Sequence, residues 1–333
     1  MKKEINMNNL LTISPSPHIH SDQSVKKIMY TVIIALMPAL VWSIFMFGFD
    51  AVRVILVSVV ACVAVEYLIQ RFIMKQEPQI TDGSAVITGI LLAFNVPSSL
   101  PCWILILGAI VAIGIGKMSF GGLGNNPFNP AILGRIFLLI SFPAQMTTWP
   151  SSLHSSVDAT TTATPLAIIK HGMKSGQSII DILPDLPSKL DLLYGNMTGS
   201  LGEISAVMLL LGFLYLLAKK VITWHIPVFI LGTVFIFQGI LCLANPAQFI
   251  NPVYSLLTGG LLLGAIFMAT DMVTSPMTVK GQLVYGIGIG VITVLIRNFG
   301  SYPEGVSFAI LIMNGFTPLI NAHIKPKRFG GKK

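Results

Sequence analysis

The sequence concentrates polar groups that can bind a ligand in one short stretch, FGGLGNNPFNPA at residues 120–131. Its three glycines let the backbone approach a flat ligand closely, and its two prolines prevent a continuous helix. Asn125, Asn126 and Asn129 supply hydrogen-bond donors and acceptors on one loop. Arg135 follows within an apolar run, where a lone arginine is costly and is expected to face a cavity or a partner. We therefore predict that this loop and Arg135 contribute to a binding site.

A second polar break closes a later apolar run, in the stretch MATDMVTSP at residues 268–276. Asp271 is an acid at or near membrane depth, where ionisable residues are functional candidates by default. Pro276 ends the helix. We expect Thr270 and Asp271 to line a binding site, with Asp271 taking part in ion coupling or in positioning a ligand.

Weaker candidates lie elsewhere in the chain. The stretch ITDGSA at residues 80–85 is either an ordinary helix cap or a helix start whose N–H groups point at a ligand. Glu66 and Glu304 are acids within or beside apolar runs, and positions at the membrane interface explain both of them as well.

A strip rich in hydroxyl groups, SSVDATTTATP at residues 155–165, lies between two long apolar regions, and four of its eleven residues are threonine. On composition alone this strip is a polar surface loop.

Other chemistries find little support in the sequence. Cys62, Cys102 and Cys242 each lie singly in an apolar run, which predicts small buried residues and neither a metal site nor an iron–sulfur cluster. The histidines are dispersed, and no Ser-His-Asp set, HExxH, Walker loop or dinucleotide fingerprint is evident; GIGIG at residues 286–290 is typical of close helix packing in a membrane. The net charge of +8 is scattered between apolar runs, so no nucleic-acid partner is expected.

Composition places the protein in a membrane. Only 10% of its residues are charged, against about 25% in soluble domains, so most of its surface must face lipid. Ten apolar runs predict an all-α polytopic membrane protein with about ten transmembrane helices. The runs lie near residues 28–48, 52–70, 83–97, 102–117, 129–146, 203–218, 225–243, 253–271, 281–297 and 304–321. The third and fourth are short and flank prolines, which predicts interrupted helices whose free backbone groups need a partner.

The distribution of basic residues predicts the orientation. With the N-terminus in the cytoplasm, fifteen of the 21 Lys and Arg residues fall in cytoplasmic segments, as the positive-inside rule expects. The polar arm 1–27 and the basic tail 322–333 are then cytoplasmic. The long loop 147–202, which contains the threonine strip, is on the outside.

The two apolar regions resemble each other. TGILL at residues 88–92 is similar to TGGLL at 258–262, and a basic residue shortly before Phe-Gly follows in each half. Five runs per half predict two inverted five-helix repeats, at 28–146 and 203–321. Chance similarity among Gly- and Leu-rich helices is the alternative.

Four stretches together resemble a known family over essentially the whole chain. The family contains the RnfD subunit of the Rnf redox-driven ion pump and the NqrB subunit of the sodium-pumping NADH:quinone oxidoreductase, and the length of this chain suits RnfD better. The stretches are DGSAVITGILLAFNVP (82–97), FGGLGNNPFNPAILGR (120–135), TDMVTSP (270–276) and IRNFGSYPEGVSFAILIMN (296–314).

The resemblance implies two flavins. In this family FMN is esterified through its phosphate to a threonine within a pattern like Asp-x-x-Ser/Thr-Gly-Ala-Thr. DATTTAT at residues 158–164 fits that frame and puts Thr164 at the attachment position, although Thr162 stands where glycine is common and is itself a candidate. The family also implies a noncovalent riboflavin among the spans, and the asparagine loop with Arg135 and the break at 270–276 are its expected pocket.

The implied function is that of a flavin-carrying subunit of a translocase in the bacterial inner membrane. It would pass electrons between flavins and partner subunits, coupled to Na⁺ or H⁺ translocation, as part of a ferredoxin:NAD oxidoreductase and not alone. The implied partners are RnfA, RnfB, RnfC, RnfE and RnfG, which must provide the NAD and ferredoxin sites. The alternative is an inverted-repeat secondary transporter or channel for a small solute, which has no need of the outer threonine loop.

Overall fold

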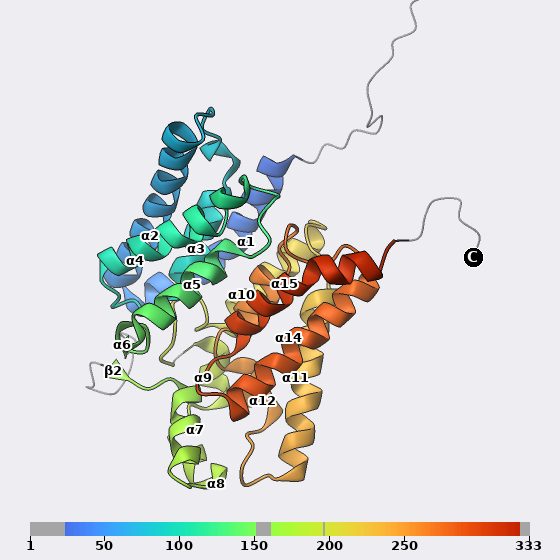
Figure 1. Ribbon diagram of the computed structural model, residues 1–333. Coiled ribbons are helices and arrows are strands. Elements are labelled where there is room, and N and C mark those ends of the chain that lie inside the picture. The colour runs from blue at the N-terminus through green and yellow to red at the C-terminus, as the bar shows by residue number, and fades with distance from the viewer. Residues whose placement is uncertain (1–23, 151–160, 196, 327–333) are drawn as a thin grey trace, which may run out of the picture.

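The structure is a computed structural model, and it describes residues 24–150, 161–195 and 197–326. The described part is helical apart from one pair of very short strands (Figure 1). Most of the predicted N-terminal arm and the end of the C-terminal tail lie outside the described residues, and so does Asp158.

The first helical group, blue to green in Figure 1, is built from five apolar stretches that pack on one another. Asn129 caps the last of them, because its side chain accepts a hydrogen bond from Ala131 N at 3.0 Å, and Pro130 begins the helix where its missing N–H costs nothing. The elements of this group are α1 (Val25–Phe47), α2 (Phe49–Leu68), η2 (Ile69–Ile73), η3 (Ile80–Asp82), α3 (Ser84–Phe94), α4 (Cys102–Ile110), η4 (Val111–Ile115), η5 (Met118–Phe120) and α5 (Pro130–Ser141).

The second helical group, yellow to red in Figure 1, contains two long helices that pack closely on each other, α11 and α14. Its third apolar run is broken into short pieces at Gly259, which has a φ of +69°, a conformation that suits glycine. The elements are α10 (Ala206–Ala218), α11 (His225–Ala244), α12 (Pro252–Leu257), α13 (Leu261–Leu263), η7 (Gly264–Met268), α14 (Val279–Phe299) and α15 (Val306–His323).

Short elements connect the two groups. The antiparallel strands β1 and β2 pair Trp149 with Thr162 and Pro150 with Thr161. Helix α7 then runs beside the second helical group toward α8 at one end of the molecule (Figure 1). These elements are α6 (Pro143–Met146), β1 (Trp149–Pro150), β2 (Thr161–Thr162), α7 (Pro165–Lys174), α8 (Ile179–Ile182), η6 (Leu183–Asp185) and α9 (Lys189–Tyr194).

The number of long membrane helices is smaller than the ten expected from the apolar runs. In the described part of the chain, six helices are long and apolar enough to cross a membrane: Val25–Phe47, Phe49–Ile73, Cys102–Phe120, His225–Ala244, Val279–Phe299 and Val306–His323. Helices α3, α5 and α10 are apolar but shorter. At about 1.5 Å per residue, the 11 residues of α3 extend roughly half of the 30 Å hydrocarbon core. The runs at 83–97, 129–146, 203–218 and 253–271 are therefore half-length or broken helices.

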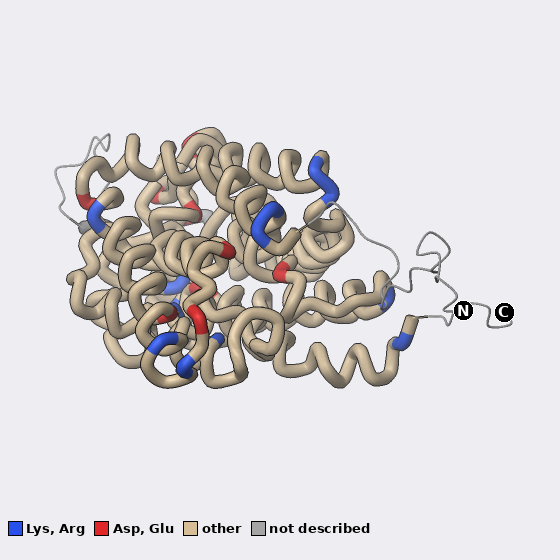
Figure 2. Tube along the Cα trace, turned by 90° about the horizontal axis from the view of Figure 1, so that it is seen from above, with Lys and Arg blue, Asp and Glu red and all other residues tan. Residues whose placement is uncertain are grey.

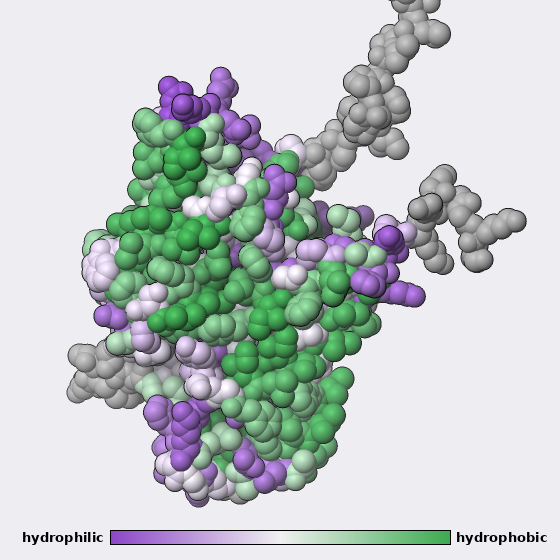
Figure 3. All heavy atoms as spheres, viewed as in Figure 1, coloured by the Kyte–Doolittle hydropathy of each residue, from purple (hydrophilic) through white to green (hydrophobic). Residues whose placement is uncertain are grey.

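The surface confirms a multi-pass membrane protein. Figure 3 shows hydrophobic residues over most of the visible face, with hydrophilic residues gathered toward the ends, and long stretches of the chain in Figure 2 carry no charge. Large apolar side chains are exposed on the long helices, including Val41, Val60 and Ile236. In a soluble protein such a surface would be an aggregation hazard, so this surface must face lipid or other membrane subunits.

Candidate functional site

Thr164 begins helix α7 as its N-cap residue. Its hydroxyl oxygen accepts a hydrogen bond from Ala167 N at 3.3 Å, and Pro165 occupies the first helical position, where proline is favoured. Thr164 is 6% exposed, and its neighbour Ala163 accepts a hydrogen bond from Thr198. The chain therefore holds this threonine at a defined place at the positive end of a ten-residue helix.

Thr164 lines a cavity of about 320 Å³ between α5, α7 and the turn that precedes α15. A cavity of this size is at the lower end of the range for small-molecule sites. Rings and charged groups surround it: Trp149, His171, Tyr302, Arg135 and Glu304. We call it the Thr164 cavity.

Arg135 forms the inner wall of the Thr164 cavity. Its guanidinium donates hydrogen bonds to Glu304 and to the Ser307 hydroxyl, while its buried Nε has no hydrogen-bond partner among the described residues. Arg135, which was expected to face a cavity or a partner, has both in the structure. Its carboxylate partner explains how an arginine is accommodated in an apolar run.

A second cavity, of about 120 Å³, lies between the two helical groups near the asparagine loop. Of the predicted residues, Asn126, Asn129, Thr270 and Asp271 all line it. Asn129 also ties the groups together, because its amide donates to Met268 O at 3.2 Å. We call it the Asn126 cavity, because the buried Oδ1 of Asn126 has no hydrogen-bond partner within the described ranges.

The two polar breaks of the sequence therefore meet in space. The Asp271 carboxylate accepts hydrogen bonds from Val273 N and from the Thr274 hydroxyl, each at 3.3 Å, so it begins the turn after η7. Thr270 donates to Ile266 O. Asn125, in contrast, is exposed and does not line the cavity.

Arg135 is separated from this group of residues. It lines the Thr164 cavity and not the Asn126 cavity, so the structure divides the predicted site residues between two places. This separation follows from the course of α5, because its N-cap Asn129 lines the Asn126 cavity and Arg135, farther along the helix, lines the Thr164 cavity.

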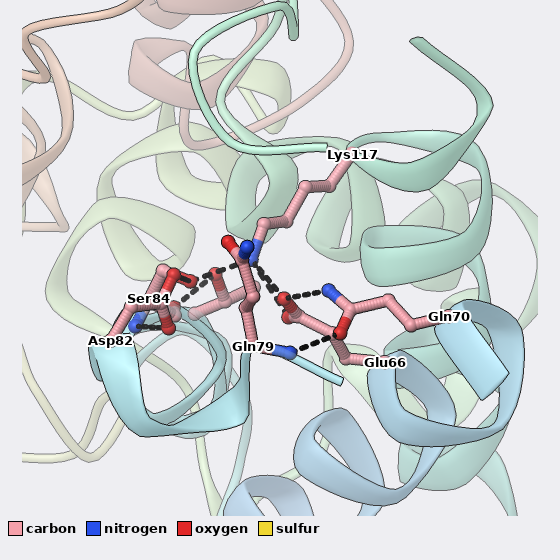
Figure 4. A network of polar contacts seen from close by, with 7 residues as sticks. Glu66, Gln70, Gln79, Asp82, Ser84 and Lys117 are labelled. Atoms are coloured by element: carbon pink, nitrogen blue, oxygen red, sulfur yellow. Dashed lines mark hydrogen bonds and ion pairs between the residues drawn. The ribbon is translucent and has the colours of Figure 1, made fainter. Parts of the chain in front are cut away.

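A buried ion pair lies beside the Asn126 cavity, and it joins the weaker candidate Glu66 to Lys117, which the sequence did not single out as a site residue. Lys117, which lines the cavity, points its ammonium at Glu66 of α2 and at the Ser84 hydroxyl that begins α3 (Figure 4). Gln70 and Asp82 extend the network, because the Gln70 amide donates to Glu66 and the Ser84 hydroxyl donates to the Asp82 carboxylate (Figure 4). The sequence does contain a sign of this pair, because two opposite charges occur in apolar runs, where each charge needs a partner.

Comparison with known sequences gives a consistent picture. Residues 12–330 match the NQR2, RnfD, RnfE family. The D subunit of a proton-translocating ferredoxin:NAD(+) oxidoreductase complex from Clostridium ljungdahlii is 44% identical over 327 residues, 98% of each chain. The D subunit of a Na(+)-translocating ferredoxin:NAD(+) oxidoreductase complex from Acetobacterium woodii is 45% identical over 330 residues, again 98% of each chain. The D subunit of an ion-translocating oxidoreductase complex from Stutzerimonas stutzeri is 38% identical over 92% of each chain. Because the family match covers nearly the whole sequence, this chain belongs to the NQR2, RnfD, RnfE family.

Proposed function

We propose that this protein is the D subunit of an ion-translocating ferredoxin:NAD(+) oxidoreductase complex in the bacterial inner membrane. Full-length similarity to two D subunits of such complexes supports this assignment. The partners would be the other Rnf subunits, RnfA, RnfB, RnfC, RnfE and RnfG. One of these relatives is named for protons and the other for sodium at nearly equal identity, so the coupling ion must be measured.

The proposal includes an FMN esterified to Thr164, and one observation carries it: Thr164 is an N-cap that opens on a cavity. A phosphoester on its oxygen puts negative charge at the N-terminus of α7, where helix ends stabilise phosphate. The oxygen remains free to accept from Ala167 N, because the ester replaces only the hydroxyl hydrogen.

The Thr164 cavity also fits the rings of such a group. Trp149 and Tyr302 offer aromatic surfaces, and His171 and Arg135 offer polar contacts. When bound, the flavin supplies the electron transfer that no side chain here can perform. The chain would hold the ring in place, exclude part of the solvent, and supply the positive charge of Arg135 close to it.

For the noncovalent riboflavin we propose the Asn126 cavity. The unpartnered Oδ1 of Asn126 can accept a hydrogen bond from a flavin ring or a ribityl hydroxyl, and Lys117 and Asp271 add charged groups. Its 120 Å³ is below the usual range for ligands. Binding therefore requires the side chains around it to move apart.

We also propose that residues 28–146 and 203–321 are inverted repeats. Contacts between corresponding elements support this, since α1 packs against α10 and α5 against α15. Helices α7 and α8 lie at the end of the molecule opposite to the turn between α2 and α3 (Figure 1). This arrangement fits cytoplasmic termini and an extracytoplasmic loop 147–202.

Covalent flavin is tested by ultraviolet fluorescence of the denatured protein on a gel, with the complex purified from a host that flavinylates it. We expect a fluorescent band in the native chain and none in Thr164→Asn. Asparagine is as good an N-cap as threonine, so this variant keeps α7 and removes only the ester oxygen. Thr164→Ala removes the helix cap as well, so comparison of the two variants separates the capping role of Thr164 from its role in the ester.

Thr162→Ala is the matched control, and its band should remain. Intact mass of the native chain should exceed that of the polypeptide by the mass of the FMN group. A native chain with the mass of the bare polypeptide would contradict the proposal. A band that persists in Thr164→Asn and disappears in Thr162→Ala would move the attachment to Thr162.

A further inference from the structure

Two buried glutamates meet behind the Thr164 cavity. Glu203 lies in the turn before α10, and Glu304 lies in the turn before α15, 101 residues later in the chain. Their side chains lie close enough to interact with each other. Glu203 is 5% exposed, and its buried Oε2 has no hydrogen-bond partner among the described residues.

The turn that carries Glu203 is fixed from several sides. Gly202 N donates to Phe94 O at 2.9 Å, and a Cβ at Gly202 would lie 2.3 Å from the Phe94 Cβ, so the turn is pressed onto the end of α3. Glu203 Oε1 accepts from Ser200 N at 3.0 Å. These contacts fix the backbone of the turn and hold the carboxyl group in its buried position.

The charges around the two glutamates are unequal. Glu304 has the guanidinium of Arg135 as a direct partner. Arg297 is also near, but its guanidinium donates to Ser255 and to Thr258 O at the end of α12. Among the described residues no cation pairs directly with Glu203, and Arg135 and Arg297 act on it from a greater distance.

Two ionised carboxylates can only accept hydrogen bonds, and at contact distance in a buried place both cannot remain charged. A hydrogen bond between them requires a proton on one of the two. Arg135 stabilises the charge on Glu304, so the proton belongs on Glu203.

We propose that Glu203 and Glu304 form a proton-binding site, in which Glu203 carries a proton and donates it in a hydrogen bond to Glu304. Glu304 lines the Thr164 cavity and Glu203 does not. Protons therefore exchange between water in the cavity and Glu203 by way of the Glu304 carboxylate. The charged and titratable groups that face the pair are Arg135 of α5 and Arg297 of α14, and His171 of α7 lines the same cavity.

In the proposed redox function, the proton of this site would compensate the negative charge of an electron. This role rests on the proposed function. If a flavin ring were bound in the Thr164 cavity, an electron on it would bring negative charge close to the pair. Coulomb attraction would then make the pair hold its proton more tightly, and loss of the electron would weaken that hold. No covalent bond other than O–H is made or broken, and the proton comes from and returns to cavity water.

Infrared spectroscopy of the purified complex tests the site directly. A protonated carboxylic acid has a C=O stretching band apart from the amide bands, and the band shifts in D₂O. At neutral pH we expect loss of one such band in Glu203→Gln, while Glu77→Gln, at an exposed acid, retains it. An unchanged band in Glu203→Gln would mean that Glu203 is ionised and would overturn the proposal.

A second variant, Glu304→Gln, tests the proposal even if Glu203→Gln does not fold. In Glu304→Gln the like charge is gone and the amide can donate to Glu203, so the band should disappear at a lower pH than in the native complex. If the band disappeared at the same pH in Glu304→Gln and in the native complex, the two glutamates would not share a proton. The Thr164→Asn complex should keep the band whether or not flavin is attached, so that failure of the flavin proposal and failure of the proton site give different results.

Discussion

Lys117 Nζ lies 2.7 Å from both carboxylate oxygens of Glu66, and the side chains of both residues are almost fully buried. The ion pair joins α2 to the end of the fourth apolar run, and the Ser84 hydroxyl at 2.6 Å adds the start of α3. Three elements of the first helical group thus share one charge-balanced centre, beside the cavity that we propose for riboflavin.

Removing one partner of this pair should destabilise the protein strongly. Glu66→Gln leaves the Lys117 ammonium buried without a counter-charge, which typically costs about 3–5 kcal/mol. Unfolding in detergent, followed by circular dichroism, measures the change. The exposed pair of Asp50 and Arg53 is the control, and Asp50→Asn should cost no more than about 1 kcal/mol. Equal losses in both variants would contradict a structural role for the buried pair.

Close packing of α2 and α3 depends on Gly89. A Cβ there would lie 2.6 Å from the Val59 Cα, a backbone atom that cannot turn aside, and the Ser58 hydroxyl donates to Gly89 O at 2.7 Å. Gly89→Ala should therefore lower stability by about 1–3 kcal/mol. Gly232→Ala, where nothing lies within 4 Å, should be neutral or slightly stabilising because alanine is the better helix former. Thermal unfolding of the two variants should differ accordingly.

Lys170 links α7 to the second helical group by hydrogen bonds. Lys170 Nζ donates to three carbonyl oxygens, those of Ile296, Arg297 and Tyr302. Burial lowers the pKa of Lys170, and nearby Lys174 lowers it further. The three acceptors offset this cost.

Lys170→Met should therefore loosen α7 and expose the segment that follows Thr164 to protease. Hydrogen bonds to charged groups contribute about 1.5–3 kcal/mol to stability. Because Lys170 is partly exposed, we expect its loss to cost an amount toward the lower value. Lys174→Met removes the same charge one turn later on an exposed position. It should leave the cleavage rate near that of the native chain. Faster cleavage in both variants would mean that loss of a positive charge, and not loss of the Lys170 hydrogen bonds, exposes the segment.

The sequence predicted the membrane class, the helical fold and several of the residues that line cavities, because these follow from local patterns. Apolar runs predict helices, and a polar break in a run predicts a cavity, as Asn129 and Asp271 show. The count of ten spanning helices was not confirmed, because six described helices are long enough to cross a membrane. Periodicity and hydropathy do not reveal where a residue such as Gly259 interrupts a run.

The division of the site into two cavities depended on distances that no local pattern contains. Arg135 follows Asn129 by less than two helical turns, so the sequence analysis placed both residues in one site. In the structure this distance along α5 is enough to put them in different cavities. Glu203 could not be paired with Glu304 for the same reason. Their contact arises only when the turn before α10 and the turn before α15 come together, although 101 residues separate the two glutamates in the chain.

Asn129 offers a test of the proposed riboflavin pocket, because its side chain performs two separable tasks. Its oxygen caps α5, and its amide donates to Met268 O across the cavity. Asn129→Asp keeps the cap and loses the donor, so the two helical groups should separate slightly at this point. With about 1 kcal/mol per hydrogen bond, retention of noncovalent flavin should fall about fivefold, while any covalent band on gels stays constant. Extraction of flavin from the native complex, Asn129→Asp and Asn125→Asp measures this, since Asn125 is exposed and away from the cavity. Equal flavin content in all three would remove the Asn126 cavity as the riboflavin pocket.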